Sequence, residues 1–183
     1  MLCHVVEPSS SDEMRQRVFR LRHRIYVQEM RLPVSSEEGL LRDVYDDAAI
    51  SLLLTDQGED IGTLRIMPKR AGMMEVEEQS GRWLKAIKDT GIPDERICEW
   101  NRFMVVRSAR GGVAAPALFY HAFHVCSARG FRYTLAAGKL GSLTKNYMKY
   151  SAKVLDAQPL PYILHGYDFG RYILLLADIG QKG

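Results

Sequence analysis

The hydrophobic positions of the chain follow two periods, and the change from one to the other predicts the order of helices and strands. The first helix is indicated by apolar residues at helical spacing, at Met14, Val18, Leu21 and Ile25. Ser10 and Glu13 have the spacing of a capping box, so we expect this helix to begin there. It should end near Pro33, because the residue before a proline avoids helical geometry. Residues 34–47 are acidic and are expected to be mostly irregular.

Short runs rich in β-branched and other large apolar residues predict the strands. Residues 50–55 and 61–67 flank a polar turn at 57–60, which is the pattern of a hairpin. The same composition predicts further strands over residues 97–106, 131–136, 162–164 and 172–178. Helical patterns occupy residues 76–89, 114–129 and 144–150. The order predicts an α+β fold over residues 1–183, a single domain whose mixed, mostly antiparallel central sheet has helices on both faces.

Composition narrows the class of protein. The 183 residues suffice for one hydrophobic core, and the hydrophobic fraction of 46% is typical of globular proteins. No apolar run approaches a membrane span, and no signal peptide is indicated. Cys3, Cys98 and Cys126 are widely spaced, so we expect reduced thiols in a cytoplasm. A net charge of +3 gives no reason to expect nucleic acid, and it is compatible with an acidic partner or an anionic substrate.

A pair of opposite charges stands in the apolar strand over residues 97–106. Glu99 and Arg102 lie there beside Trp100 and Phe103. Residues three apart on a regular strand point to opposite faces, so we predict a bulge or splay between Glu99 and Val105 if the pair serves one site. Glu99 is a candidate general base, and the alternative is that it pairs with an arginine for structural reasons.

A second group of charges combines Arg22, Arg65 and Arg102 with Asp43 and Asp46. In a binding site, an arginine of this group would hold a substrate carboxylate while an aspartate holds the amine. The alternative is an ion-pair network that fixes the acidic segment to the domain. The sequence leaves both interpretations open.

Four motifs in chain order resemble the acyltransferase fold of the GNAT superfamily. They are residues 21–29 (LRHRIYVQE), 43–46 (DVYD), 62–68 (GTLRIMP) and 99–103 (EWNRF). Within the superfamily, they are similar to N-acyl amino acid synthases and acyl-homoserine-lactone (autoinducer) synthases. The resemblance implies transfer of a medium or long acyl chain from acyl carrier protein, or from acyl-CoA, to the amine of an amino acid or similar small molecule.

Two departures from these families bear on the substrates. Autoinducer synthases carry a tryptophan shortly after the first helix, where this chain reads Met30-Arg31-Leu32-Pro33. This favours an amino acid acceptor over S-adenosylmethionine. The pyrophosphate loop of ordinary GNAT enzymes is relaxed here to Arg110-Gly111-Gly112-Val113, which is similar to members that use acyl carrier protein. An autoinducer synthase, an acetyl-CoA-dependent acetyltransferase and an inactive regulatory member are the alternatives.

The resemblance also implies roles for individual residues. The expected catalytic residues are Glu99 and Arg102. The expected substrate-binding residues are Arg22, Tyr26, Asp43, Asp46, Arg65, Trp100 and Phe103. The expected donor-binding residues are Val105, Arg107, Arg110, Gly111, Gly112 and Val113. We expect no tightly bound cofactor and no metal.

The aromatic and basic residues each have two interpretations. Tyr26, Trp83, Trp100 and Phe103 would line an acyl tunnel or simply fill the core. Acyl carrier protein would dock on the arginines of the first helix or on a stripe of lysines, Lys145, Lys149 and Lys153, which is otherwise a solvated helix face.

Overall fold

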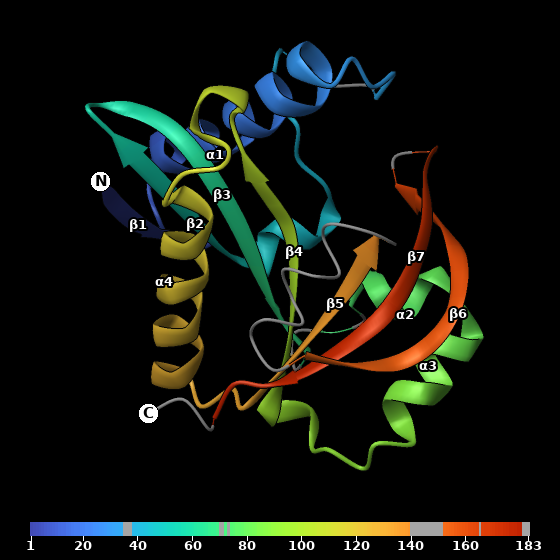
Figure 1. The fold of residues 1–183 in the computed structure, drawn as a ribbon. Helices are drawn as coiled ribbons and strands as arrows, with labels where there is room; N and C mark the ends of the chain where they lie inside the picture. The colour runs from blue at the N-terminus through green and yellow to red at the C-terminus, as the bar shows by residue number, and fades with distance from the viewer. Residues whose placement is uncertain (35–37, 70–71, 73, 140–151, 165, 181–183) are drawn as a thin grey trace. The chain divides into compact units, whose positions relative to one another are not determined.

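The structure is a computed structural model that describes residues 1–34, 38–69, 72, 74–139, 152–164 and 166–180. Figure 1 shows its helices and strands as a ribbon. The contacts within the chain divide it into two compact units. The first unit consists of Met1–Ile66 and Asn101–Val125, and the second of Met67–Trp100 and Cys126–Gly183. That residues 1–183 act as one domain stays a prediction.

Strands β1 (Leu2–Val6), β2 (Ile50–Asp56) and β3 (Glu59–Pro68) begin the sheet in the first unit. β1 pairs with β2, and β2 with β3, both antiparallel. The predicted hairpin is confirmed, and Gln57 and Gly58 at its turn have φ of 48° and 85°, as a tight turn between twisted strands requires. β1 was not predicted from the sequence.

The first helix differs in detail from its prediction. α1 (Asp12–His23) begins after Ser11, whose hydroxyl accepts from the N–H of Met14, whereas the hydroxyl of Ser10 accepts from the N–H of Glu7. The predicted cap at Ser10 is therefore wrong by one residue. The helix continues as a π-helix, η1 (Arg24–Glu29), and ends before Pro33.

Helix α4 (Ala114–Ala128) confirms the prediction for residues 114–129. Its buried residues in the first unit are Ala114, Leu118, Phe119 and Ala122. A Cβ placed on Gly62 of β3 would stand 3.0 Å from Leu118 Cδ1 and 3.2 Å from the carbonyl oxygen of Met104. Gly62 thus permits the close approach of the helix to β3 and β4.

Strand β4 (Ile97–Val105) confirms the predicted central strand and belongs to both units. In the second unit, β5 (Tyr133–Lys139) pairs parallel with β4 and antiparallel with β7 (Tyr167–Asp178). β6 (Ala152–Leu164) pairs antiparallel with β7. Strands β6 and β7 contain the predicted residues 162–164 and 172–178 but are longer.

The helix predicted over residues 76–89 is two helices. α2 (Glu75–Gln79) and α3 (Gly81–Lys88) are separated by Ser80, whose hydroxyl accepts from the N–H of Trp83 and so begins α3. The prediction of one helix was wrong because Ser80-Gly81 ends the first helix and caps the second. The helix predicted over residues 144–150 lies outside the described residues.

The strand order is β1-β2-β3-β4 in the first unit and β4-β5-β7-β6 in the second, seven strands among the described residues. Four of the registered pairs are antiparallel and one is parallel, so the predicted α+β class with a mixed, mostly antiparallel sheet is confirmed. None of the helices in the described residues combines the length and the apolar character that crossing a membrane requires.

Candidate functional site

Arginines and aspartates that the sequence singled out form one buried network in the first unit. Arg22 Nη1 lies 2.7 Å from Asp46 Oδ1, and Arg65 Nη1 lies 3.0 Å from the same oxygen. Arg65 Nη1 also lies 2.5 Å from Asp43 Oδ1, and Arg102 donates to the other oxygen of Asp43. All five residues of the predicted group are therefore joined, and the ion-pair interpretation is realised. Whether the group also binds substrate stays a prediction.

The two carboxylates are placed by a short turn. In η2 (Val44–Asp47), Asp43 Oδ1 accepts from the N–H of Tyr45 at 3.0 Å. Asp46 Oδ2 accepts in return from the N–H of Asp43 at 2.9 Å. This reciprocal capping fixes both side chains independently of their contacts with the arginines.

The arginines keep these carboxyl groups ionised. Burial raises the pKa of Asp43, but the charges of Arg65 and Arg102 outweigh it, so its pKa is lowered overall. The pKa of Asp46 is lowered in the same way, with burial opposed by Arg22 and Arg65. Burial lowers the pKa of Arg22, and Asp46 partly restores it. The network is therefore charged at neutral pH.

Strand β4 departs from regular geometry at the predicted place. Arg102 has a φ of 48°, in the left-handed region that non-glycine residues seldom adopt. The ladder between β4 and β5 pairs Ile97 to Glu99 and extends no further in the described register. The predicted irregularity between Glu99 and Val105 is confirmed, and such distortions are frequent beside active sites.

Glu99 lies in the second unit and is fully buried. Its Oε2 accepts from the N–H of Val76 in α2 at 3.3 Å. Glu75 and Glu77 of the same helix are also buried; Tyr162 donates to Glu75, and Lys69 pairs with Glu77. Sequence reasoning missed these groups, although three glutamates within the four residues 75–78 were a signal.

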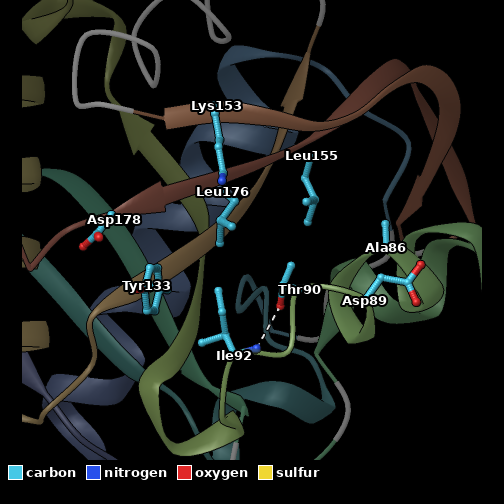
Figure 2. A pocket seen from close by; sticks show the side chains of 9 residues that line it. All are labelled: Ala86, Asp89, Thr90, Ile92, Tyr133, Lys153, Leu155, Leu176 and Asp178. Atoms are coloured by element: carbon cyan, nitrogen blue, oxygen red, sulfur yellow. Dashed lines mark hydrogen bonds between the residues drawn. The ribbon is translucent and has the colours of Figure 1, made fainter.

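A cavity of about 670 Å³ opens in the second unit (Figure 2). Its lining comes from α3 with the following loop and from β5, β6 and β7, and consists of Ala86, Asp89, Thr90, Ile92, Tyr133, Lys153, Leu155, Leu176 and Asp178. Leu155 and Lys153 face Thr90 and Ile92 across it (Figure 2).

The strand register relates Glu99 to this cavity. Glu99 pairs with Leu135, Leu135 with Leu176, and Leu176 with Lys153, so these residues occupy one cross-strand row. Paired residues point to the same face of a sheet, and Glu99 therefore lies on the cavity's face although it is not among the lining residues.

The predicted aromatic lining is core in the second unit. Trp83 and Trp100 are almost completely buried, and Trp100 Nε1 lies 3.3 Å from Cys126 Sγ. In the first unit, Phe103 is partly exposed and packs on Phe119 with ring centroids 4.8 Å apart. Tyr26 in η1 is also partly exposed. None of the four lines the cavity of Figure 2.

The predicted donor-binding residues come together in one loop of the first unit. Arg107 begins the short helix η5 (Arg107–Ala109), and Arg110 Nε donates to the carbonyl oxygen of Val105 at 2.9 Å. Gly111 has a φ of 83°, and Val113 is 64% exposed just before α4. The loop, which ends with Gly112 and Val113, presents its surface to solvent, and its role in binding the donor stays a prediction.

The family model described as "N-acyl amino acid synthase FeeM" matches residues 17–139. The chain belongs to this family, so the protein is an acyltransferase. This confirms the resemblance identified from the four motifs. No curated protein sequence gives a significant match.

Solved structures share the fold at low sequence identity. FeeM, an N-acyl amino acid synthase from uncultured soil microbes, is 13% identical, with 99% of this chain and 97% of that chain covered and a TM-score of 0.73. The CoA-dependent acyl-homoserine lactone synthase BjaI, solved with SAM and isopentyl-CoA, is 21% identical, with coverages of 99% and 84% and a TM-score of 0.72. A putative N-acetyltransferase from Lactobacillus plantarum is 18% identical, with coverages of 98% and 99% and a TM-score of 0.64.

Proposed function

We propose that the protein is an N-acyl amino acid synthase that transfers a medium or long acyl chain from acyl carrier protein. The acceptor is the amine of an amino acid or a similar small molecule. Membership of the FeeM family supports this assignment. Free thiols at Cys3, Cys98 and Cys126 are in keeping with a reducing cytoplasm, where acyl carrier protein is found.

The reaction joins an amine to a thioester carbonyl. The acceptor ammonium, whose ordinary pKa is about 8, first loses a proton to a base. The amine nitrogen then attacks the carbonyl carbon, the C–S bond breaks, and the thiolate leaves with a proton from the nitrogen. An amide and a free phosphopantetheine thiol result, so the chemistry calls for positioning, one base and polarisation of the carbonyl oxygen.

The observation that carries the proposal is the course of β4. Its ladder with β5 ends at Glu99, and the left-handed conformation of Arg102 turns the strand away from regular pairing. We assign the main chain of this irregular segment the task of binding the amides of the phosphopantetheine arm and polarising the thioester carbonyl.

We assign Glu99 to deprotonation of the acceptor, directly or through a water. Its burial and its position at the end of the ladder support the assignment. In the first unit, the ionised Asp43 is by itself a candidate for binding a cationic substrate group, with Arg65 and Arg102 fixing its carboxylate. The loop that includes Arg107, Arg110 and Gly111 is assigned to the phosphate of the donor.

Product analysis tests the function. The purified protein is incubated with acyl carrier protein thioesters of several chain lengths. Each reaction also contains an acceptor, which is a set of amino acids in one series and S-adenosylmethionine in the other. We expect N-acyl amino acids, identified by mass. An acyl-homoserine lactone product would instead assign the protein to the autoinducer synthases. A parallel reaction uses acetyl-CoA as the donor, and products formed only in that reaction would assign the protein to the acetyltransferases.

A further inference from the structure

The anion-binding groups of the loop over residues 107–110 are already occupied by a carboxylate of the chain itself. Glu29 Oε2 accepts from the backbone N–H of Arg107 at 2.9 Å and lies 3.4 Å from Arg110 Nη2. Its other oxygen lies 3.8 Å from Arg24 Nε. All of these residues belong to the first unit. The carboxylate is thus held by a main-chain donor and two guanidinium groups, a set of partners that equally suits a phosphate.

The π-helix puts Glu29 in this place. In η1, the N–H of Met30 donates to the carbonyl oxygen of Ile25 at 2.9 Å, which is a bond across five residues instead of four. Such a turn holds one residue more than an α-helical turn and changes the direction in which the following side chains point. π-turns are uncommon in proteins as a whole, but many of them occur at functional sites. Local geometry that costs stability is usually kept because it serves a function.

A donor phosphate on this loop would meet a negative charge. The Glu29 side chain is only 17% exposed, so its repulsion on a neighbouring anion is screened less than that of a freely exposed carboxylate. The phosphate must either displace the carboxylate from Arg107 and Arg110 or bind beside it. Both cost free energy that increases with the charge of the donor.

We propose that Glu29 is a built-in competitor for the donor phosphate, and that it makes the enzyme discriminate between carriers by charge. Coenzyme A brings a pyrophosphate and a ribose phosphate, whereas the arm on acyl carrier protein brings a single phosphodiester. Glu29 therefore weakens the binding of coenzyme A more than that of a singly linked phosphopantetheine. The inference rests on the proposed function, because it presumes a phosphopantetheine donor.

Calorimetric titration with coenzyme A and with 4′-phosphopantetheine tests the proposal without turnover. Glu29→Gln keeps the size of the side chain and removes its charge. We expect it to bind coenzyme A about tenfold more tightly than the wild type. The gain in affinity for 4′-phosphopantetheine should be smaller, and both gains should shrink at high salt. Glu13→Gln, which removes an exposed carboxylate from α1 in the same unit, is the matched control and should change neither.

Kinetics supply a second readout. The KM for acyl-CoA should fall in Glu29→Gln while kcat is retained, and Arg110→Ala should weaken the binding of both probes. Glu29→Asp keeps the charge and should show no gain. Circular dichroism checks that each variant is folded.

Coenzyme A binding to Glu29→Gln that is equal to or weaker than wild-type binding would overturn the proposal and leave Glu29 as a structural tether of the loop. Failure of both proteins to bind either probe would overturn it as well. Tighter binding by Glu29→Gln without any acyl transfer would uphold the competitor and reject the proposed function. Acyl transfer without the gain in binding would uphold the proposed function and reject the competitor role of Glu29.

Discussion

Arg102 donates to the carboxylate of Asp43 from a backbone conformation with a φ of 48°. A non-glycine residue in this region costs about 1–3 kcal/mol, which the surrounding contacts must offset. Here the offset comes from a buried ion pair whose partner is fixed by its own turn and by Arg65. The irregular strand and the charge network therefore depend on each other.

The first prediction concerns the stability of this network. Asp43→Asn removes a charge that Arg65 and Arg102 share, and leaves two buried cations with less compensation. We expect the free energy of unfolding to fall by about 3 kcal/mol, measured by urea denaturation. Asp47→Asn, which breaks the exposed pair with Arg15, should cost less than 1 kcal/mol, or about the value of a surface ion pair. Equal losses in the two variants would contradict the role assigned to the network.

The network also predicts how stability depends on pH. The folded-state pKa values of Asp43 and Asp46 lie below the unfolded value of about 3.9. Their ion pairs therefore contribute full stability above that pH, and the contribution is lost as the pH falls through the folded-state values. Wild-type stability should decline from about pH 4 downward, and the decline should be shallower in Asp43→Asn. Identical acid profiles, followed by denaturant midpoints, would count against the shifted carboxyl groups.

The parts of the fold that the sequence predicted are those with strong local signals. Residues 97–106 are almost uniformly apolar around two charges, and the structure has β4 there. The long apolar helix after Gly111 and Gly112 was equally clear. The grouping of Asp43 and Asp46 with the arginines was also predictable, because the motifs that contain them occur in the chain order of a known family. The local hydrophobic pattern alone does not group these residues.

The parts that sequence reasoning missed depend on tertiary pairing. β1 has exposed Leu2 and Val5 and is defined by its partner β2, so it shows no buried alternation of its own. β6 contains Pro159 and Pro161, which argue against a strand. Its place at the end of the strand order explains how it tolerates them, since an edge strand has one unpaired side.

The members of the charge network were grouped correctly from the sequence, but other contacts of the candidate residues were not predicted. The contact of Glu29 with Arg107 depends on a π-turn, and no sequence pattern indicates such a turn. The bond between Glu99 and Val76 likewise joins segments 23 residues apart in the chain. Spacing rules describe neighbours along one element, and these contacts are set by how elements pack.

Close packing at Gly62 gives a prediction independent of catalysis. Gly62→Ala places a Cβ 3.0 Å from Leu118 Cδ1 and 3.2 Å from the backbone of Met104, and a backbone atom in a strand cannot easily yield. We expect a loss of about 1–3 kcal/mol in the free energy of unfolding. Gly81→Ala, where a Cβ would meet nothing within 4 Å at the start of α3, should be neutral or stabilising. A neutral Gly62→Ala would show that α4 and β3 are not in the close contact described.

Replacement of Glu99 separates its catalytic and structural interpretations. In Glu99→Gln, the amide oxygen still accepts from the N–H of Val76, so α2 keeps its anchor while the base is lost. We expect kcat to fall by about 10²–10⁴-fold at neutral pH, with the loss diminishing as the pH rises and more of the acceptor amine is already neutral. The thermal midpoint, measured alongside, should stay close to that of the wild type. Retention of kcat together with a lowered thermal midpoint would establish Glu99 as a structural partner of α2 and transfer the task of deprotonation to another group.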